Sequence, residues 1–205
     1  MHNTLNGITA LTHLGVIKVE GDDAAKFLHG QLTQDFSLLG TTEARLAAFC
    51  SAKGRMQASF IGFKTRPTEI LLICPTDVLA PAMKRLSMFV MRAKAKFSNV
   101  SAEMAIYGLA GDAIEKVAAS TDAAWARAEI GTATLIQLYP ADGVPRALWI
   151  APSSPAAPHG EALSAALWEL GAVRSGIALT TTPLAEAFVP PMLNYDSLGG
   201  GPFKK

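Results

Sequence analysis

The sequence predicts an α+β protein with mostly antiparallel sheets, built of ferredoxin-like units. The order strand, helix, two or three strands, helix and strand occurs twice along the chain, with variation in the second half. Half of the 205 residues are hydrophobic and 17% are charged, which is enough apolar material for a sizeable folded core. The chain carries neither the glycine fingerprint of a Rossmann fold nor a P-loop, so a parallel nucleotide-binding sheet is not predicted.

Five runs in the first half have the alternation or the composition of β-strands. They span residues 15–21, 43–50, 55–64, 69–74 and 91–97. A helix is expected after the first run, capped by Asp22 or Asp23 and ended or loosened by Gly30. Apolar residues at helical spacing over 79–90 predict a second, amphipathic helix, which follows a turn at Pro75 because proline cannot continue a central strand.

The second half repeats this order. Its strands are expected at residues 105–109, 132–139 and 146–151, and its helices at residues 112–119 and 160–170. We expect two interlocked subdomains, one of residues 1–44 with 103–205 and the other of residues 45–102. The irregular tail at residues 190–205 is expected to be partly frayed.

Composition and charge exclude several classes of protein. The net charge of +1 gives no global attraction to nucleic acid or to a membrane, and the apolar runs are far shorter than the roughly 20 residues of a membrane span. No signal peptide is recognisable at the N-terminus. Two cysteines are too few for a disulfide framework, and the four histidines are scattered. We therefore expect a cytoplasmic protein without a metal site, a membrane partner or a direct nucleic-acid partner.

The turn between the strands at 43–50 and 55–64 carries Lys53, Gly54 and Arg55. Gly54 can adopt positive φ and allow close approach of a ligand, and the two cations suit a carboxylate or a phosphate. The turn is therefore either a solvated hairpin tip or an anion-recognising corner of a ligand cleft.

Polar residues follow the end of the first helix. Gln31, Thr33 and Asp35 offer an amide, a hydroxyl and a carboxylate, which can bond the backbone in a capped turn or bond a ligand. A second group is a locally basic segment that has no acidic residue between Asp77 and Glu103, and it is either a solvated surface or a site for a polyanion. Its cations are Lys84, Arg85, Arg92, Lys94 and Lys96.

Trp168, with Arg174 downstream, stands on a helix that is otherwise rich in leucine and alanine. A tryptophan in this setting either fills the core or forms an aromatic wall on which a flat heterocycle stacks. No nucleophile–base pair is recognisable, so no catalytic residue is assigned and a hydrolase is not supported.

Five sequence blocks occur in a fixed order over nearly the whole chain. They are FLHGQLTQD at 27–35, CSAKGRM at 50–56, Trp168 with RSGI at 174–177, FVPPMLN at 188–194, and LGGGPFKK at 198–205. In this order they resemble the folate-binding YgfZ family, relatives of the T-protein (aminomethyltransferase) of the glycine cleavage system.

This resemblance implies a GcvT-like folate-binding fold whose cleft holds tetrahydrofolate or a derivative. It also implies a role in maintaining iron–sulfur enzymes and in some tRNA modification, with such enzymes as partners. Trp168 matches a tryptophan that contacts folate in YgfZ-like proteins, and the anionic glutamate tail of folate suits the cations. The candidate folate-binding residues are Gln31, Thr33, Asp35, Lys53, Gly54, Arg55, Arg92, Trp168 and Arg174.

Two departures from the family pattern guide the choice among functions. In YgfZ-like proteins the Phe-Lys-Lys segment continues into Gly-Cys-Tyr-x-Gly-Gln-Glu and a C-terminal β-barrel, whereas this sequence ends at Lys205. Aminomethyltransferases carry a functional aspartate after the strand equivalent to 70–74, but Asp77 comes too early and alanine or proline fills the expected place. We therefore expect a folate-binding accessory protein rather than a tetrahydrofolate-dependent aminomethyltransferase. A third alternative is a scaffold that has lost its ligand and binds partners through the basic segment.

Overall fold

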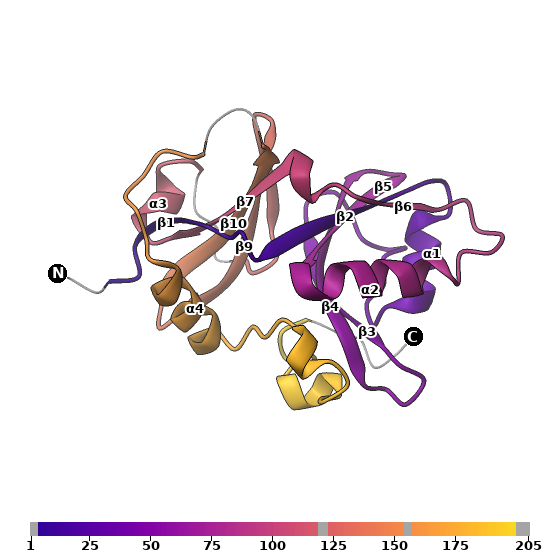
Figure 1. The fold of residues 1–205 in the computed structure, drawn as a ribbon. Helices are drawn as coiled ribbons and strands as arrows, with labels where there is room; N and C mark the ends of the chain where they lie inside the picture. Colours follow the sequence, from indigo (N-terminus) through magenta and orange to yellow (C-terminus); the bar gives the residue numbers. More distant parts are fainter. Residues whose placement is uncertain (1–3, 119–122, 154–156, 200–205) are drawn as a thin grey trace. The chain divides into compact units, whose positions relative to one another are not determined.

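The computed structural model describes residues 4–118, 123–153 and 157–199 (Figure 1). The chain divides into two compact units. Unit 1 comprises Met1–Thr12 and Ala102–Ala178, and unit 2 comprises His13–Ser101 and Leu179–Lys205. Residues 13–44 and the tail therefore group with the middle of the chain, whereas the sequence predicts that they group with the second half.

Unit 2 contains one five-stranded antiparallel sheet in the order β3-β4-β5-β2-β6. Strand β2 leads through α1 into the β3–β4–β5 meander, and β5 leads through α2 into β6. The four strands β4-β5-β2-β6 have the ferredoxin-like order, and the β3–β4 hairpin adds β3 at one edge. The elements are β2 (Leu14–Glu20), α1 (Ala24–Gln31), β3 (Ala44–Cys50), β4 (Met56–Arg66), β5 (Glu69–Pro75), α2 (Thr76–Ser87) and β6 (Lys96–Asn99).

Unit 1 repeats this layout in the sheet order β1-β7-β10-β9-β8, again with every neighbouring pair antiparallel. The N-terminal strand β1 occupies beside β7 the place that β6 occupies beside β2 in unit 2. The repeated order predicted from the sequence is confirmed. The elements are β1 (Gly7–Ala10), β7 (Met104–Ala110), α3 (Asp112–Glu115), β8 (Arg127–Ile130), β9 (Ala133–Ala141), β10 (Val144–Pro152) and α4 (Ala165–Arg174).

The core of unit 2 lies where the two helices cover the sheet. Helix α1 buries Phe27 and Leu28, and α2 buries Val78, Leu79 and Leu86 at the spacing that one helix face requires. The predicted turn at Pro75 is confirmed, because β5 ends at this residue, but α2 spans Thr76–Ser87 instead of the predicted 79–90. None of the helices in the described part of the chain has both the length and the apolar character needed to cross a bilayer.

The predicted strand at 91–97 is wrong over most of its length, because only Lys96–Asn99 forms a strand. Met91 has a positive φ of 29°, which breaks the extended conformation. The backbone of Lys94 bonds Asp23 instead of a neighbouring strand, with its N–H donating to Oδ2 at 2.8 Å and its carbonyl accepting from Asp23 N at 3.1 Å. The basic segment therefore has no single strand face.

Two further predicted helices have different bounds in the structure. Helix α4 begins at Ala165 rather than at residue 160, because the Ser164 side chain accepts a hydrogen bond from Leu167 N and caps the first turn. Helix α3 ends at Glu115 after a single turn, before residue 119, which lies outside the described residues.

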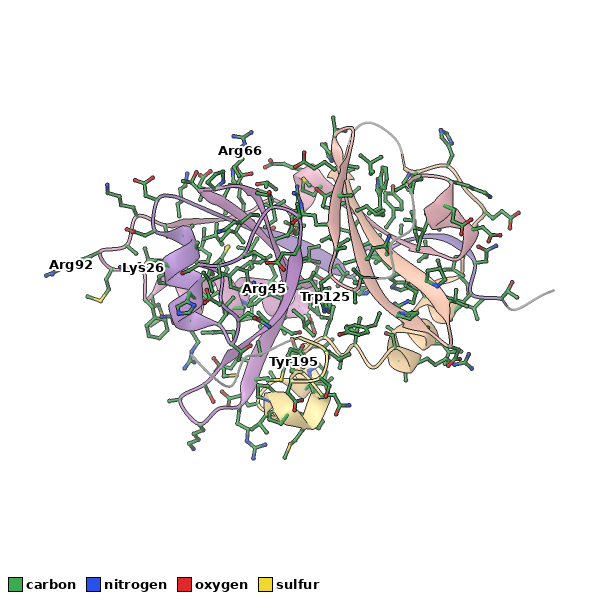
Figure 2. All side chains as sticks on the ribbon, turned by 180° about the vertical axis from the view of Figure 1, so that it is seen from behind. Lys26, Arg45, Arg66, Arg92, Trp125 and Tyr195 are labelled. Carbon is green, nitrogen blue, oxygen red and sulfur yellow. The ribbon has the colours of Figure 1, made fainter. Side chains whose placement is uncertain are left out.

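The described part of the tail, as far as residue 199, makes defined contacts within unit 2, and partial fraying of residues 190–205 stays a prediction. Two short 3₁₀ turns, η2 (Thr182–Leu184) and η3 (Pro190–Leu193), shape it. Tyr195 is fully buried and its hydroxyl interacts with Ser59 of β4, and Gln34 Nε2 donates to the carbonyl of Gly199. Figure 2 labels Tyr195 on this tail. Residues 200–205 lie outside the described part.

Candidate functional site

Unit 2 contains a cavity of about 560 Å³ beside helix α2, here called the α2 pocket. Its apolar walls come from β3, α2 and the residue after α2, and its polar groups come from β4, α2 and the tail. The apolar lining includes Phe49, Val78, Pro81, Ala82 and Met88, and the polar lining includes Gln57, Lys84, Arg85, Thr182 and Glu186. This volume lies within the range of roughly 300–1,000 Å³ that is typical of small-molecule sites.

The tail wall of the pocket is held by α2 itself. Pro81 lies inside α2 and lacks the N–H that would bond the carbonyl of Asp77. Thr182 takes over this carbonyl through Oγ1 at 3.2 Å, and its backbone N–H donates to Asp77 Oδ2 at 2.8 Å. Two backbone hydrogen bonds join the tail to Met56 of β4. Glu186 N donates to the carbonyl of Met56 at 2.7 Å, and Met56 N donates to the carbonyl of Phe188 at 2.8 Å.

The cations of the pocket are available to a ligand. Lys84 and Arg85 occupy the last turn of α2, are exposed, and form no ion pair among the described residues. Across the pocket, Gln57 Nε2 donates to Glu186 Oε1 at 2.7 Å, while the buried Gln57 Oε1 has no hydrogen-bond partner within the described chain. The site therefore combines apolar walls, two uncommitted cations and uncommitted hydrogen-bond acceptors.

The hairpin tip adopts the predicted turn, with φ of +75° at Gly54. Its hydrogen bonds run from Gly54 N to the carbonyl of Ser51 and from Ser51 N to the carbonyl of Arg55, both at 2.8 Å. Arg55 Nη1 donates to the carbonyl of Ala187 at 2.8 Å, so this cation anchors the tail, while Lys53 is exposed. None of the three predicted residues of the tip is among those that line the α2 pocket.

The polar residues after α1 hold the local turn. Thr33 Oγ1 accepts from Ala48 N at 2.9 Å, and Asp35 Oδ1 accepts from Leu38 N at 3.0 Å. This backbone hydrogen bond, together with the charge of His29 3.0 Å away, lowers the pKa of Asp35 against a smaller opposing effect of burial. Gln31 is half-buried at the end of α1. The capped-turn alternative accounts for these contacts.

The cations of the basic segment differ in their surroundings. Lys84 and Arg85 line the α2 pocket, whereas Lys94 Nζ lies 3.6 Å from Asp22 and Lys96 Nζ lies 3.8 Å from Glu20. Figure 2 shows the Arg92 side chain pointing outward from the loop that follows α2.

Trp168 and Arg174 belong to unit 1, on α4. Trp168 is 5% exposed, and a Cβ added at Gly108 would lie 2.7 Å from its ring, so the indole fills the core against β7. Arg174 Nη1 is paired with Asp142 Oδ2 at 2.9 Å. Arg146 of β10, which the sequence reading did not single out, lies against the indole. The only feature of the sequence that could indicate Arg146 is that a cation stands within a largely apolar strand segment.

Gln57 and Glu186 were also missed by the sequence reading. Gln57 is the polar position near the start of the largely buried strand β4, which is a weak signal. Glu186 lies in an irregular segment that carries none. The described residues contain no group of three or more histidine, cysteine or acidic side chains that could hold a metal ion.

Comparison with known proteins agrees with this fold. The chain is 30% identical over 203 residues to the tRNA-modifying protein YgfZ of Edwardsiella ictaluri, covering 92% of this chain and 60% of that protein. It is 25% identical over 205 residues to the tRNA-modifying protein YgfZ of Colwellia psychrerythraea, covering 95% and 62%. No family model matches the chain.

A solved structure shares the fold. The glycine cleavage system aminomethyltransferase T from Bartonella henselae superposes with a TM-score of 0.63 at 14% identity, covering 74% of this chain and 43% of that one. This chain is a YgfZ-like protein with the fold of an aminomethyltransferase. It spans less than two thirds of the length of the YgfZ relatives.

In the YgfZ-like chain, the place where aminomethyltransferases are expected to carry an aspartate falls on α2. Residues 80–82 read Ala-Pro-Ala, and Pro81 and Ala82 form part of the apolar wall of the α2 pocket. Asp77 is committed to Thr182 and is not among the lining residues.

Proposed function

We propose that this YgfZ-like chain binds a reduced folate in the α2 pocket and is part of an accessory protein that supports tRNA modification and the maintenance of iron–sulfur enzymes. The observation that carries the proposal is the meeting of an apolar pocket with two uncommitted cations, Lys84 and Arg85. The relatives named as tRNA-modifying proteins support the accessory role.

The chemistry of the pocket suits a folate. A pterin is flat and requires apolar walls with a few polar groups, and the glutamate tail is anionic. Phe49, Val78 and Met88 supply apolar surface, and Lys84 and Arg85 supply charge for the carboxylates. Because Ala-Pro-Ala replaces the expected aspartate, aminomethyl transfer is not proposed. Contacts of folate with Gln31, Thr33, Asp35, Lys53, Gly54, Arg55, Arg92, Trp168 and Arg174 stay predictions.

Calorimetric titration with 5-formyltetrahydrofolate tests binding. Calorimetry is preferred to intrinsic fluorescence because all three tryptophans belong to unit 1 and none is among the residues that line the α2 pocket. We expect saturable micromolar binding that weakens by about tenfold or more when Lys84 and Arg85 are both changed to glutamine. The matched control changes Lys26 and Arg66 to glutamine, since both are exposed in unit 2 and lie outside the pocket lining. Absence of binding by folded wild-type protein would contradict the proposal.

The accessory role is tested in a bacterium that lacks its own YgfZ. Expression of the protein should restore modified tRNA nucleosides, measured by mass spectrometry, and the Lys84→Gln/Arg85→Gln variant should restore fewer. Full restoration of the modified nucleosides by that variant would show that the cellular role does not depend on the cations of the α2 pocket.

A further inference from the structure

We infer that Gln57 and Glu186 are the specificity-determining residues of the α2 pocket, and that they recognise the ring edge of a ligand that donates two N–H hydrogen bonds. The 2-amino-4-oxopyrimidine edge of a pterin has this chemistry. The inference rests on the proposed function and adds which residues would orient the folate.

The first observation is an unsatisfied acceptor. Gln57 Nε2 is committed to Glu186 Oε1 at 2.7 Å, which leaves the Gln57 carbonyl oxygen directed elsewhere. That oxygen is buried and has no hydrogen-bond partner among the described residues. Buried polar atoms without partners are uncommon in folded proteins. Because Gln57 belongs to the pocket lining, we infer that a donor of the ligand satisfies this oxygen.

The second observation is the backbone of Glu186. This residue has φ of +63°, in the left-handed region that a non-glycine residue seldom adopts. The strand β4 holds it there, because Glu186 N donates to the carbonyl of Met56 at 2.7 Å. Strained backbone of this kind is concentrated at ligand sites, and Glu186 is one of the residues that line the α2 pocket.

The third observation is that the acidic and basic side chains of the pocket are not paired with each other. Glu186 makes no ion pair with Lys84 or Arg85, although all three line the same cavity of the described chain. A ligand with two N–H donors on one ring edge and carboxylates on its tail satisfies both groups at once. The second oxygen of Glu186 and the carbonyl of Gln57 accept from the ring edge, and the cations bind the tail.

A cycle of two ligands and two proteins tests this assignment. Calorimetry compares 5-formyltetrahydrofolate with its 2-desamino-2-methyl analogue, on wild type and on Glu186→Gln. We expect the wild type to bind the analogue about tenfold more weakly, and Glu186→Gln to bind both ligands with similar, weakened affinity. Such non-additivity indicates that Glu186 contacts the 2-amino group. Glu169→Gln, an exposed glutamate of unit 1, serves as the matched control and should retain the wild-type difference.

Each other outcome overturns the inference. If the two losses add, Glu186 does not contact the ring edge, although folate binding by the wild type would still support the proposed function. If the wild type binds no folate, the proposed function and the inference fall together. Thermal unfolding of each variant establishes that it is folded, and Gln57→Leu provides a second variant that removes the same end of the site and should reproduce the non-additivity.

Discussion

The guanidinium of Arg146 lies over the indole of Trp168, with its Cζ 4.1 Å from the ring centroid. Arg146 is 1% exposed and has no acidic partner among the described residues, and burial lowers its pKa to about 10. Its Nη1 donates to Ser175 Oγ at 2.8 Å. The face of the indole therefore supplies part of the favourable environment that a buried cation requires.

Replacing Trp168 with alanine should destabilise unit 1 severely. The change leaves a cavity and removes the aromatic face from a buried cation, so we expect a loss of about 3–5 kcal/mol in the free energy of unfolding. Urea denaturation measures it, and Trp168→Phe, which keeps an aromatic face, should lose less. Equal losses in the two variants would contradict a role for the aromatic face.

Gly108 must lack a side chain because Trp168 packs on it. A Cβ at this position would lie 2.7 Å from the indole, so Gly108→Ala should cost about 1–3 kcal/mol of stability. Gly30→Ala is the opposite control, because the position is open and lies in α1, where alanine should add about 0.5–1 kcal/mol. A tolerated Gly108→Ala would show that the indole is not held against β7.

The pH dependence of stability should include a contribution from Asp35. Its folded pKa lies below the ordinary 3.8, so the unfolded state takes up the proton first as the pH falls. The stabilisation is complete well above pH 4 and is lost as the pH falls through 3.8 toward the folded pKa. Urea unfolding between pH 6 and 3 should show a steeper fall for wild type than for Asp35→Asn. Parallel curves would exclude this contribution.

The two cysteines should differ in reactivity. Both are free thiols, and burial, aided by the charge of Asp77, raises the pKa of the fully buried Cys74 to about 12. Burial also raises the pKa of Cys50, which is only half-buried. Iodoacetamide should therefore modify Cys50 slowly and Cys74 only after unfolding in urea, as measured by mass spectrometry. Modification of Cys74 in the native protein would show that unit 2 opens at β5.

Much of the fold could be predicted from the sequence because it depends on local signals. The alternation of strands, the position of Pro75 before α2 and the positive φ of Gly54 each follow from a few neighbouring residues. The loop at 91–95 could not be predicted, because its backbone bonds Asp23, which lies 71 residues away from Lys94. No local feature of this basic and apolar stretch reveals that a distant residue takes its backbone hydrogen bonds.

The sequence by itself determined the family, the repeated ferredoxin-like order and the cationic character of residues 84–96. Only the tertiary structure decided which of those cations meet an apolar wall, and that Gln57 contacts Glu186 across 129 residues of sequence. It also decided that Trp168 packs on Gly108 beside Arg146. The physical reason is that periodicity and turn chemistry act over a few residues, whereas a site is assembled by packing between distant segments.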